Sequence, residues 1–396
     1  MRAERLRLPA RAVVVSGWFP PRPGGSAALM GNLLQWFHRD DWVVATGAPP
    51  PDEARTLLLD GARVVHVSRY RRLRGRGHQL WTAAQIPTAA RRTAALARRE
   101  RAAVIVGVFP DLQHLAVAYL AHRLTGLPLA VYLHDFILEA GYTSYLGALA
   151  RWLHPRVLAA ARPVWTMSGA MSARFAEVHG VATTPLVHPY NEPIPDEVAD
   201  VEPPRELRAL FTGSIAPANG AALARVARAV GQVGGRLTVL GPNDRGTLAR
   251  YGVDLPHVRC GFVASRADVL DAMRAHDVLV TTLSWPDESW VGAEEVAAMF
   301  PTKLPEYLAQ GRPVLGHCPA HYTMAAFMAE HDCGWLVTDR SEEALAAALH
   351  DIATDAAARR KRGANALGTA RRFAGPRIAA QFRDELTAAV SGTGRP

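Results

Sequence analysis

The chain of 396 residues is 49% hydrophobic, which is enough apolar material for two domains that each bury a core. Its net charge of +9 lies in arginine clusters with few interleaved aromatic residues, which argues against nucleic acid as a partner. Its three cysteines, Cys260, Cys318 and Cys333, lack the spacing of a zinc site or a disulfide framework. No apolar stretch has the length of a membrane span, so we expect a cytoplasmic protein.

Short apolar runs alternate along the chain with stretches of helical spacing. Such runs are typical of strands that are buried on both faces of a parallel sheet. The strands expected in the first half are Val13–Val15, Trp42–Ala45, Val64–Val67, Val104–Val106, Leu129–Leu133 and Val164–Thr166. Those expected in the second half are Ala209–Thr212, Leu237–Leu240, Val258–Cys260, Val278–Thr281, Val314–Gly316 and Trp335–Val337. The pattern predicts an α/β fold with two Rossmann-like, doubly wound domains that face a central cleft.

A proline-rich stretch separates the two halves. Residues 189–204 contain five prolines and several acidic residues, which interrupt the alternation of strands and helices. We therefore expect a first domain at 1–190, a linker at 191–206 and a second domain at 207–372. Ligands of such sheets bind beyond the C-terminal ends of the strands, so residues that follow the strands are the candidates for a site.

Arginine is concentrated at 69–76 and again at 91–101, where the spacing predicts a helix. A basic helix face can rest on an anionic membrane surface or meet an anionic acceptor. It can equally be a solvated surface without a partner. Peripheral contact with the inner face of the membrane is therefore one of two open interpretations.

The stretch from Phe300 to Leu315 carries the most specific pattern in the chain. It places Lys303 and Glu306 in the first turns of a short helix that Thr302 can cap and that tolerates Pro305 near its start. Free N–H groups and an ammonium at a helix start suit a phosphate, whereas a carboxylate one turn on suits a sugar diol. Together they suggest a nucleotide-sugar, although a solvated lysine at a helix start is the plainer alternative.

Lysine is otherwise nearly absent. Of the 45 basic residues only Lys303 and Lys361 are lysines, and all the others are arginine. A lysine retained in such a chain indicates a need for a compact ammonium group.

A glycine pair, Gly24-Gly25, follows the first expected strand. Glycines between a first strand and its helix let the backbone approach a ligand closely. Neither half carries a Walker A loop or a G-x-G-x-x-G fingerprint.

In their order and spacing these features resemble retaining GT-B glycosyltransferases of the family 4-like group, over nearly the whole chain. A subgroup of that family starts its donor-binding block with Phe-Pro-Ser/Thr-Lys, as this chain does at Phe300–Lys303. The resemblance implies that the first domain binds the acceptor, that the second binds the donor, and that a C-terminal helix at 373–396 packs back on the first. The other matching segments are Val13–Gly25, His134-Asp135, Pro189–Asn191, Phe211–Gly220 and Arg372–Phe382.

Two departures from the family pattern concern charge. The family commonly has a second glutamate eight positions before Glu306, where this chain has Ala298. The family also commonly has a basic pair where this chain has the neutral Ser214 and Asn219. We expect Lys303 to replace the missing charge, with Arg245 as the second choice.

The resemblance implies transfer of a sugar from a nucleoside diphosphate sugar to a hydroxyl, with retention and without a metal or other cofactor. The residues expected to be catalytic are Lys303, His134 and Glu306. Those expected at the donor are Gly24, Gly25, Gly213, Ser214, Asn219, Arg245, Phe262, Val263, Thr302 and Leu304, and those expected at the acceptor are Asp111, His114 and Asp135. Trp285, Asp287, Glu288 and Trp290 precede the donor block, and the two tryptophans either stack on a sugar or anchor a long loop.

Two other functions stay open on the sequence alone: a catalytically inactive GT-B binding subunit, and a sugar-nucleotide epimerase. The acceptor can be a lipid-linked glycan, a polysaccharide or a small natural product. The arginine- and alanine-rich composition suggests a bacterial source.

Overall fold

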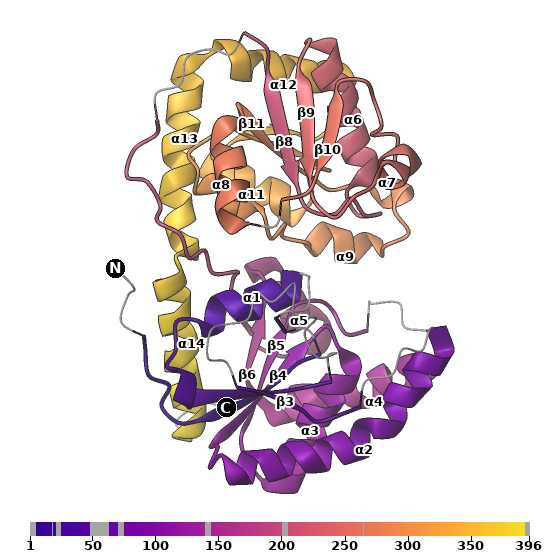
Figure 1. Cartoon of the computed structure of the whole chain (residues 1–396), viewed down its shortest axis with the longest axis vertical. Helices are drawn as coiled ribbons and strands as arrows, with labels where there is room; N and C mark the ends of the chain where they lie inside the picture. Colours follow the sequence, from indigo (N-terminus) through magenta and orange to yellow (C-terminus); the bar gives the residue numbers. More distant parts are fainter. Residues whose placement is uncertain are drawn as a thin grey trace. The chain divides into compact units, whose positions relative to one another are not determined.

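The computed structural model describes residues 5–17, 19–20, 25–47, 63–69, 75–138, 144–199, 205–263 and 265–392. The side chains of residues 75, 76, 78, 79, 144 and 145 are outside this description. The chain forms two compact units (Figure 1). Unit 1 comprises Met1–Asn191 and Ala374–Pro396, and unit 2 comprises Glu192–Phe373.

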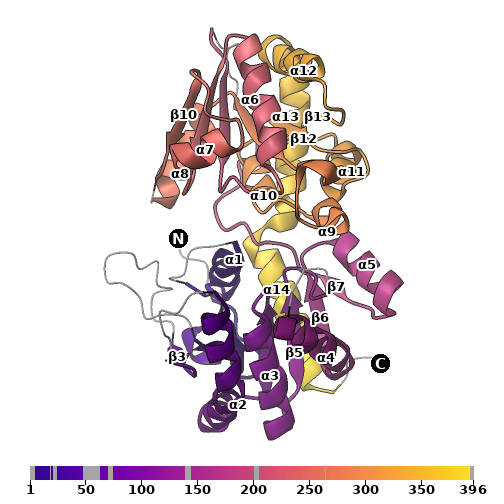
Figure 2. The same cartoon turned by 90° about the vertical axis from the view of Figure 1, so that its right-hand side faces the viewer.

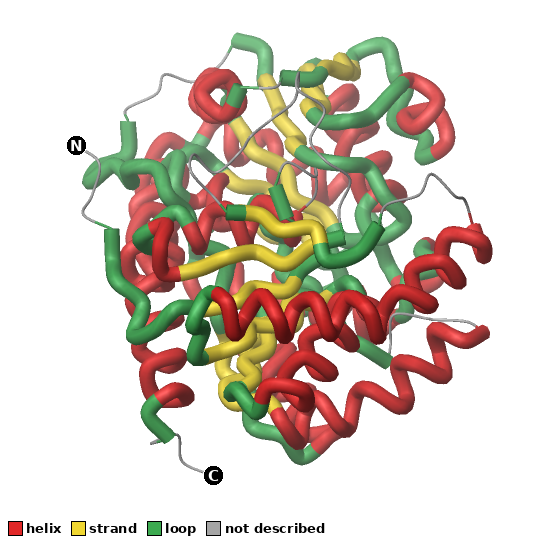
Figure 3. The backbone as a smooth tube through the Cα atoms, turned by 60° about the horizontal axis from the view of Figure 1, so that its bottom comes forward, coloured by secondary structure: helices red, strands yellow, loops and turns green. Residues whose placement is uncertain are grey.

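Unit 1 contains a sheet of seven parallel strands in the order β3-β2-β1-β4-β5-β6-β7. The strands appear as the yellow tubes of Figure 3, with helices on both faces. Their bounds are β1 (Ala12–Val15), β2 (Trp42–Thr46), β3 (Val64–His66), β4 (Val104–Phe109), β5 (Leu129–Leu133), β6 (Ala161–Thr166) and β7 (Thr184–Pro185). The strand order reverses between β1 and β4, which is the point where doubly wound sheets bind ligands.

The helices of unit 1 form two layers. On one side, α1 and α14 share a buried core with the strands; on the other, α2, α3 and α4 pack side by side. Gly107 of β4 lies directly under α3, where an added Cβ would be 3.0 Å from that of Ala118. The helices are α1 (Gly25–Leu34), α2 (Gly75–Arg99), α3 (Leu112–Thr125), α4 (Ser144–Ala160), α5 (Gly169–His179) and α14 (Gly375–Val390), with a 3-10 turn η1 (Arg39–Asp41).

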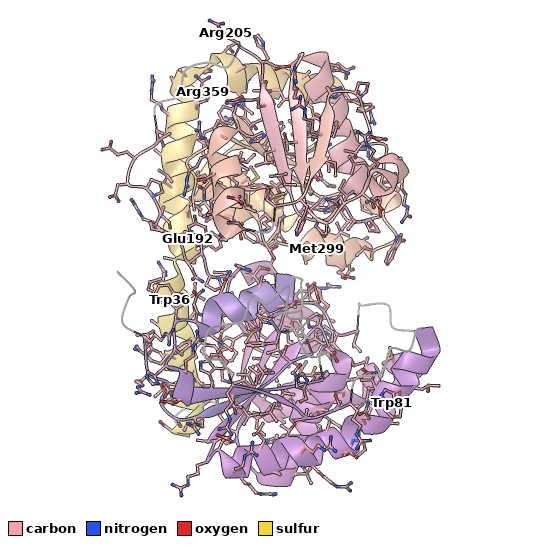
Figure 4. The ribbon with its side chains drawn as sticks, in the orientation of Figure 1. Trp36, Trp81, Glu192, Arg205, Met299 and Arg359 are labelled. Carbon is pink, nitrogen blue, oxygen red and sulfur yellow. The ribbon has the colours of Figure 1, made fainter. Side chains whose placement is uncertain are left out.

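The C-terminal helix α14 belongs to unit 1 and is held at its start and in its middle. At its start, the N–H of Gly375 donates to Tyr190 O (2.7 Å), and the indole of Trp36 (labelled in Figure 4) is so near that a Cβ on Gly375 would lie 2.4 Å from Nε1. Further along, Trp165 of β6 donates to Glu385 (2.7 Å) and packs on Phe382 with ring centroids 4.7 Å apart. Apolar burial and a buried indole hydrogen bond therefore hold the helix in place.

Unit 2 contains a sheet of six parallel strands in the order β10-β9-β8-β11-β12-β13. Helices α6 and α12 pack together over one face, while α10 packs against α13 (Figure 2). The strands are β8 (Arg208–Thr212), β9 (Arg236–Leu240), β10 (Val258–Gly261), β11 (Val278–Thr282), β12 (Val314–His317) and β13 (Trp335–Val337). The helices are α6 (Gly220–Gln232), α7 (Arg245–Arg250), α8 (Arg266–Ala275), α9 (Ala293–Ala298), α10 (Leu304–Leu308), α11 (Thr323–His331), α12 (Glu342–Thr354) and α13 (Ala356–Ala370), with 3-10 turns η2 (Pro286–Glu288) and η3 (Arg371–Phe373).

The predicted fold class, with two doubly wound parallel sheets, is confirmed. Each expected apolar run lies in a strand, except that Val67 lies one residue beyond β3, and the chain adds the two-residue strand β7 at the edge of the first sheet. Of the arginine clusters, Arg91, Arg92, Arg98 and Arg99 are exposed on α2, whereas Arg71, Arg72 and Arg74 lie outside the described residues. Among the described residues, no helix is both long and apolar enough to cross a membrane.

Candidate active site

In unit 2 the loop after β8 is closed by its own hydrogen bonds. The side chain of Asn219 accepts from Ala216 N (2.8 Å) through Oδ1 and donates to Ser214 O (3.2 Å) through Nδ2. Thr282, at the end of β11, donates to the carbonyl of Asn219 (3.2 Å) and so ties the loop to the next strand. The family commonly carries a basic pair at the positions of Ser214 and Asn219. In this chain the side-chain amide of Asn219 instead fixes the shape of the loop.

The start of the same loop depends on a glycine and a second amide. Gly213 has φ of 126°, a conformation that favours glycine. Asn243 donates to Gly213 O (2.8 Å) and accepts from Ile215 N (2.8 Å). The backbone after β8 is therefore held in one shape before any ligand binds.

Helix α10 carries the lysine and glutamate of the donor block. It begins at Leu304, with Lys303 as its N-cap residue and Pro305 in its first turn. No side chain caps it, so the expected cap by Thr302 is wrong: Leu304 N instead donates to Pro301 O (3.0 Å) in a tight turn. With five residues the helix has only a weak dipole, and the positive charge at its start comes from side chains.

The carboxylate of Glu306 is buried, with 5% of the residue exposed. Lys303 Nζ lies 3.2 Å and Arg266 Nη1 2.8 Å from its oxygen Oε2. A buried carboxylate requires such partners, because desolvation of an unpaired charge is costly. The site therefore combines one buried anion with two partly exposed cations.

Arg266 was not predicted from the sequence. It is the first residue of α8, and Ser265 caps that helix by accepting from Asp268 N (3.4 Å). Forty positions separate Arg266 from Glu306, and nothing in its neighbourhood distinguishes it from the many other arginines. Only the folded chain brings the two together.

Tyr307 connects the donor block to the loop after β8. Its buried hydroxyl accepts from Thr212 N (2.7 Å) and lies 3.0 Å from Thr212 Oγ1. Thr212 is the last residue of β8, directly before Gly213. This one buried contact fixes α10, which carries Leu304 and follows Lys303, against the start of the loop after β8.

Three other predicted donor residues lie after neighbouring strands. Arg245, the first residue of α7, is exposed and paired with Asp254 (3.1 Å). Phe262 follows β10 and is 68% exposed, which is unusual for a phenylalanine, and Val263 beside it is half-buried. An exposed aromatic face after a strand is available to a planar ligand group.

The loop after β11 is anchored by a buried ionic network. Arg225 of α6 forms two hydrogen bonds to Glu288 and stacks over Trp285 at 4.5 Å, while Arg340 lies over the same ring at 5.4 Å. Trp285 thus contacts two guanidinium groups and anchors the loop. Trp290, in contrast, is 85% exposed.

His317 completes this network as a neutral base. Its Nδ1 lies 3.0 Å from Val337 O, which requires a proton on Nδ1, so Nε2 accepts from Arg225 Nε (3.1 Å). Burial, with the Arg225 charge adding to it, lowers the pKa of His317 to about 4.

In unit 1, His134 follows β5 and is 8% exposed. Its ring packs edge-on against Tyr132, with centroids 4.5 Å apart, and neither ring nitrogen has a hydrogen-bond partner among the described residues. Burial, with His188 adding to it, lowers the pKa of His134 to about 3, so the ring is neutral at physiological pH. Burial also raises the pKa of the neighbouring Asp135.

Asp111 and His114 meet where the strand order reverses. Asp111 caps α3 by accepting from His114 N (2.9 Å), and its Oδ2 lies 3.1 Å from His114 Nδ1. A Cβ on Gly17, after β1, would lie 2.0 Å from the same carboxylate oxygen. Gly25 begins α1, and Gly24 lies outside the described residues.

The predicted residues therefore form separate groups within each unit. Unit 2 brings Lys303, Leu304 and Glu306 together with the loop that contains Gly213, Ser214 and Asn219, whereas Arg245 is paired elsewhere. In unit 1, Asp111 contacts His114. Within the described part of the chain, no group of three or more His, Cys, Asp or Glu side chains is arranged to hold a metal ion.

Two family models together match most of the chain. Residues 24–191 match the model described as a glycosyl transferase 4-like domain, and residues 206–355 match the model described as glycosyl transferases group 1. With its two Rossmann-like units, the chain is a GT-B glycosyltransferase. Within that class it belongs to the family 4-like group, so the family expected from the sequence is confirmed.

Solved structures share the fold across nearly their whole length. The Anabaena protein HepE in complex with UDP-glucose is 19% identical, with a TM-score of 0.69, 96% of this chain covered and 99% of that one. Sucrose-phosphate synthase from Thermosynechococcus elongatus is 16% identical, with a TM-score of 0.71 and coverages of 97% and 99%. A glycosyltransferase from Rickettsia africae is 12% identical, with a TM-score of 0.63 and coverages of 97% and 99%. No curated protein matches the chain in sequence.

Proposed function

We propose that the chain transfers a sugar from a nucleoside diphosphate sugar to an acceptor hydroxyl, with retention at the anomeric carbon and without a metal. The observation that carries this proposal is the pairing of Lys303 with the buried carboxylate of Glu306 (3.2 Å) at the start of α10, between β11 and β12 of unit 2. An ammonium group suits a diphosphate and a carboxylate suits a ribose diol. One short helix thus offers both halves of a nucleotide recognition site.

In the reaction the bond between the anomeric carbon and the diphosphate oxygen breaks, and a bond to the acceptor oxygen forms. The acceptor proton passes to the departing phosphate, so no side chain serves as general base. Charge develops on the leaving diphosphate, and positioned cations lower the barrier by stabilising it. Lys303 supplies that charge, and the backbone N–H group of Ser214 is a further candidate donor.

The nucleobase is assigned to the loop after β10. The exposed ring of Phe262 offers a stacking face, and the backbone at Val263 offers hydrogen bonds. The structure of HepE contains UDP-glucose, which makes a UDP-sugar the first donor to test.

His134 is assigned to the transferred sugar. A neutral imidazole can donate one hydrogen bond and accept another from sugar hydroxyls without placing a charge beside the anomeric carbon. Asp135 would orient the same sugar. Asp111 and His114 are assigned to the acceptor, which can be a lipid-linked glycan, a polysaccharide or a small natural product; the exposed arginines of α2 suit an acceptor at an anionic membrane surface.

Thermal stabilisation by UDP, GDP, dTDP and ADP tests the proposal. A ligand at about 100 times its dissociation constant adds roughly 2.7 kcal/mol to the free energy of unfolding. We expect one diphosphate to stabilise the wild type, and its sugar conjugates then to be turned over with release of that diphosphate. The anomeric configuration of the product, read by NMR, tests retention.

A second candidate, a binding subunit without catalysis, is favoured by the neutral Ser214 and Asn219. The two functions differ in turnover. Stabilisation by a nucleotide sugar without release of diphosphate, across acceptors of all three classes, would favour the binding subunit. Absence of stabilisation by every diphosphate would refute nucleotide recognition altogether.

A further inference from the structure

Two cations share one carboxylate oxygen in unit 2. Lys303 Nζ and Arg266 Nη1 lie 3.2 and 2.8 Å from Glu306 Oε2. Their charged groups are therefore separated by no more than the combined length of two hydrogen bonds. The oxygens of a single diphosphate can reach both groups at such a separation.

The loop after β8 provides no comparable charge. Ser214 is exposed and neutral, and the amide of Asn219 is occupied within the loop by Ala216 N and Ser214 O. Arg245, the other cation expected to substitute, pairs with Asp254 at 3.1 Å. A departing diphosphate carries several negative charges, so the lysine alone would leave much of that charge uncompensated.

We propose that Arg266 is the second diphosphate-binding cation of this chain and replaces the basic side chains that the loop after β8 lacks. This inference rests on the proposed function and extends it to a residue that the sequence did not indicate. The side chain of Arg266 is 38% exposed, so a ligand can reach it. A guanidinium has five N–H donors, so it can keep its bond to Glu306 while donating to phosphate oxygens.

Glu306 and Glu192 hold the guanidinium in place before a ligand arrives. Glu306 is buried and 2.8 Å away; Glu192 (labelled in Figure 4) has its Oε1 3.7 Å from Arg266 Nε. Fixing a long side chain in advance reduces the entropy that is lost when the ligand binds. The carboxylate thus serves two purposes: it is placed for the ribose, and it positions both cations for the diphosphate.

Titration calorimetry on the full chain tests this role. The ligands are inorganic pyrophosphate, which has no base, and the four diphosphates UDP, GDP, dTDP and ADP with their monophosphates. We expect Arg266→Gln to weaken pyrophosphate and the preferred diphosphate at least about tenfold, and the monophosphate much less. Arg274→Gln is the matched control, because Arg274 lies on the same helix as Arg266 and pairs with the exposed Asp271 (3.0 Å), and we expect it to bind like the wild type.

The outcomes separate the inference from the proposed function. Unchanged affinity of Arg266→Gln for pyrophosphate and diphosphate would overturn the inference alone, and so would an equal loss for diphosphate and monophosphate. Binding of pyrophosphate that depends on Arg266, without binding of any nucleotide, would overturn the proposed function alone. Melting curves show whether each variant is folded, and Arg266→Lys, which keeps a charge beside Glu306, gives the same comparison if the glutamine variant is unfolded.

Discussion

Arg225 and Glu288 form an ion pair with two hydrogen bonds, Nη1 to Oε1 at 2.5 Å and Nη2 to Oε2 at 3.0 Å. Only 9% and 17% of the two side chains are exposed, so water screens the pair weakly. The pair fixes η2, the first turn after β11, on α6. The shape of the loop that precedes the donor block therefore depends on an interaction between segments that are 63 positions apart.

Loss of one member of this pair is expected to destabilise unit 2. Arg225→Met leaves the carboxylate of Glu288 with the Trp285 N–H and the more distant Arg340 (3.8 Å), and we expect the free energy of unfolding to fall by about 3 kcal/mol. Chemical denaturation of Arg225→Met, Glu288→Gln and the double variant checks this. If the losses of unfolding free energy in the two single variants add up to the loss in the double variant, the two residues do not interact. A loss in the double variant that is smaller than this sum would support the pair.

Removal of the Lys303 ammonium is expected to impair turnover more than folding. Lys303→Ala should lower kcat about 100-fold, because a group that stabilises the leaving diphosphate is lost. Release of nucleoside diphosphate from the donor sugar measures the effect. Lys361→Ala is the matched control, since Lys361 of α13 is 71% exposed and pairs with Asp332 at the end of α11. A similar decrease in both variants would contradict the assignment.

Substitution of Glu306 separates ribose recognition from diphosphate recognition. We expect Glu306→Gln to weaken the preferred nucleoside diphosphate about tenfold, because charge-assisted bonds to the diol are lost. Pyrophosphate should lose less affinity than the nucleoside diphosphate, because removal of a negative charge beside its site offsets the weaker positioning of Lys303 and Arg266. Calorimetry with both ligands decides, and a loss confined to pyrophosphate would refute the ribose assignment.

Buried histidines are expected to make the fold sensitive to acid. His154 on α4 is 4% exposed and lies 4.3 Å from the ring of His179; burial, with His179 adding to it, lowers its pKa from 6.5 to about 4. As pH falls below 6.5 the unfolded chain binds a proton that the folded chain does not. Stability should therefore decrease toward pH 4 by about 1.4 kcal/mol per pH unit from this residue.

His154→Phe tests that linkage, because it keeps an aromatic ring beside Phe175 and removes the titrating group. Urea denaturation at pH 7, 6 and 5 should show a shallower pH dependence in the variant than in the wild type. Equal pH dependence in both proteins would mean that His154 takes up its proton alike in the folded and unfolded states.

The sheets could be predicted because their strands are continuous apolar runs, and the deviations have local causes. The run at Val104–Val106 predicts too short a strand, because Gly107 ends the apolar run. Strand β4 in fact continues to Phe109. A glycine stands within the strand because α3 packs so closely on this position that only a residue without a side chain fits. Strand β7 was missed, because Thr184–Pro185 is too short for any pattern and pairs only at the sheet edge.

The site could be predicted only where its residues are neighbours in the sequence. Lys303 and Glu306 are three positions apart on a helix, and that spacing places them side by side. The contact of Arg266 with Glu306 depends on how the segment after β10 folds back, and the occupation of the Asn219 amide depends on the shape of a loop. Neither is encoded in a local pattern of residue types.

The scarcity of lysine also makes the chain suited to chemical footprinting. An amine-reactive reagent meets two lysine side chains, of which Lys303, 38% exposed beside Glu306, reports on the proposed diphosphate site. Lys361, 71% exposed, provides an internal reference in the same molecule. Mass spectrometry of the modified peptides would then follow occupancy by any candidate donor in the unsubstituted protein, whichever acceptor the enzyme uses.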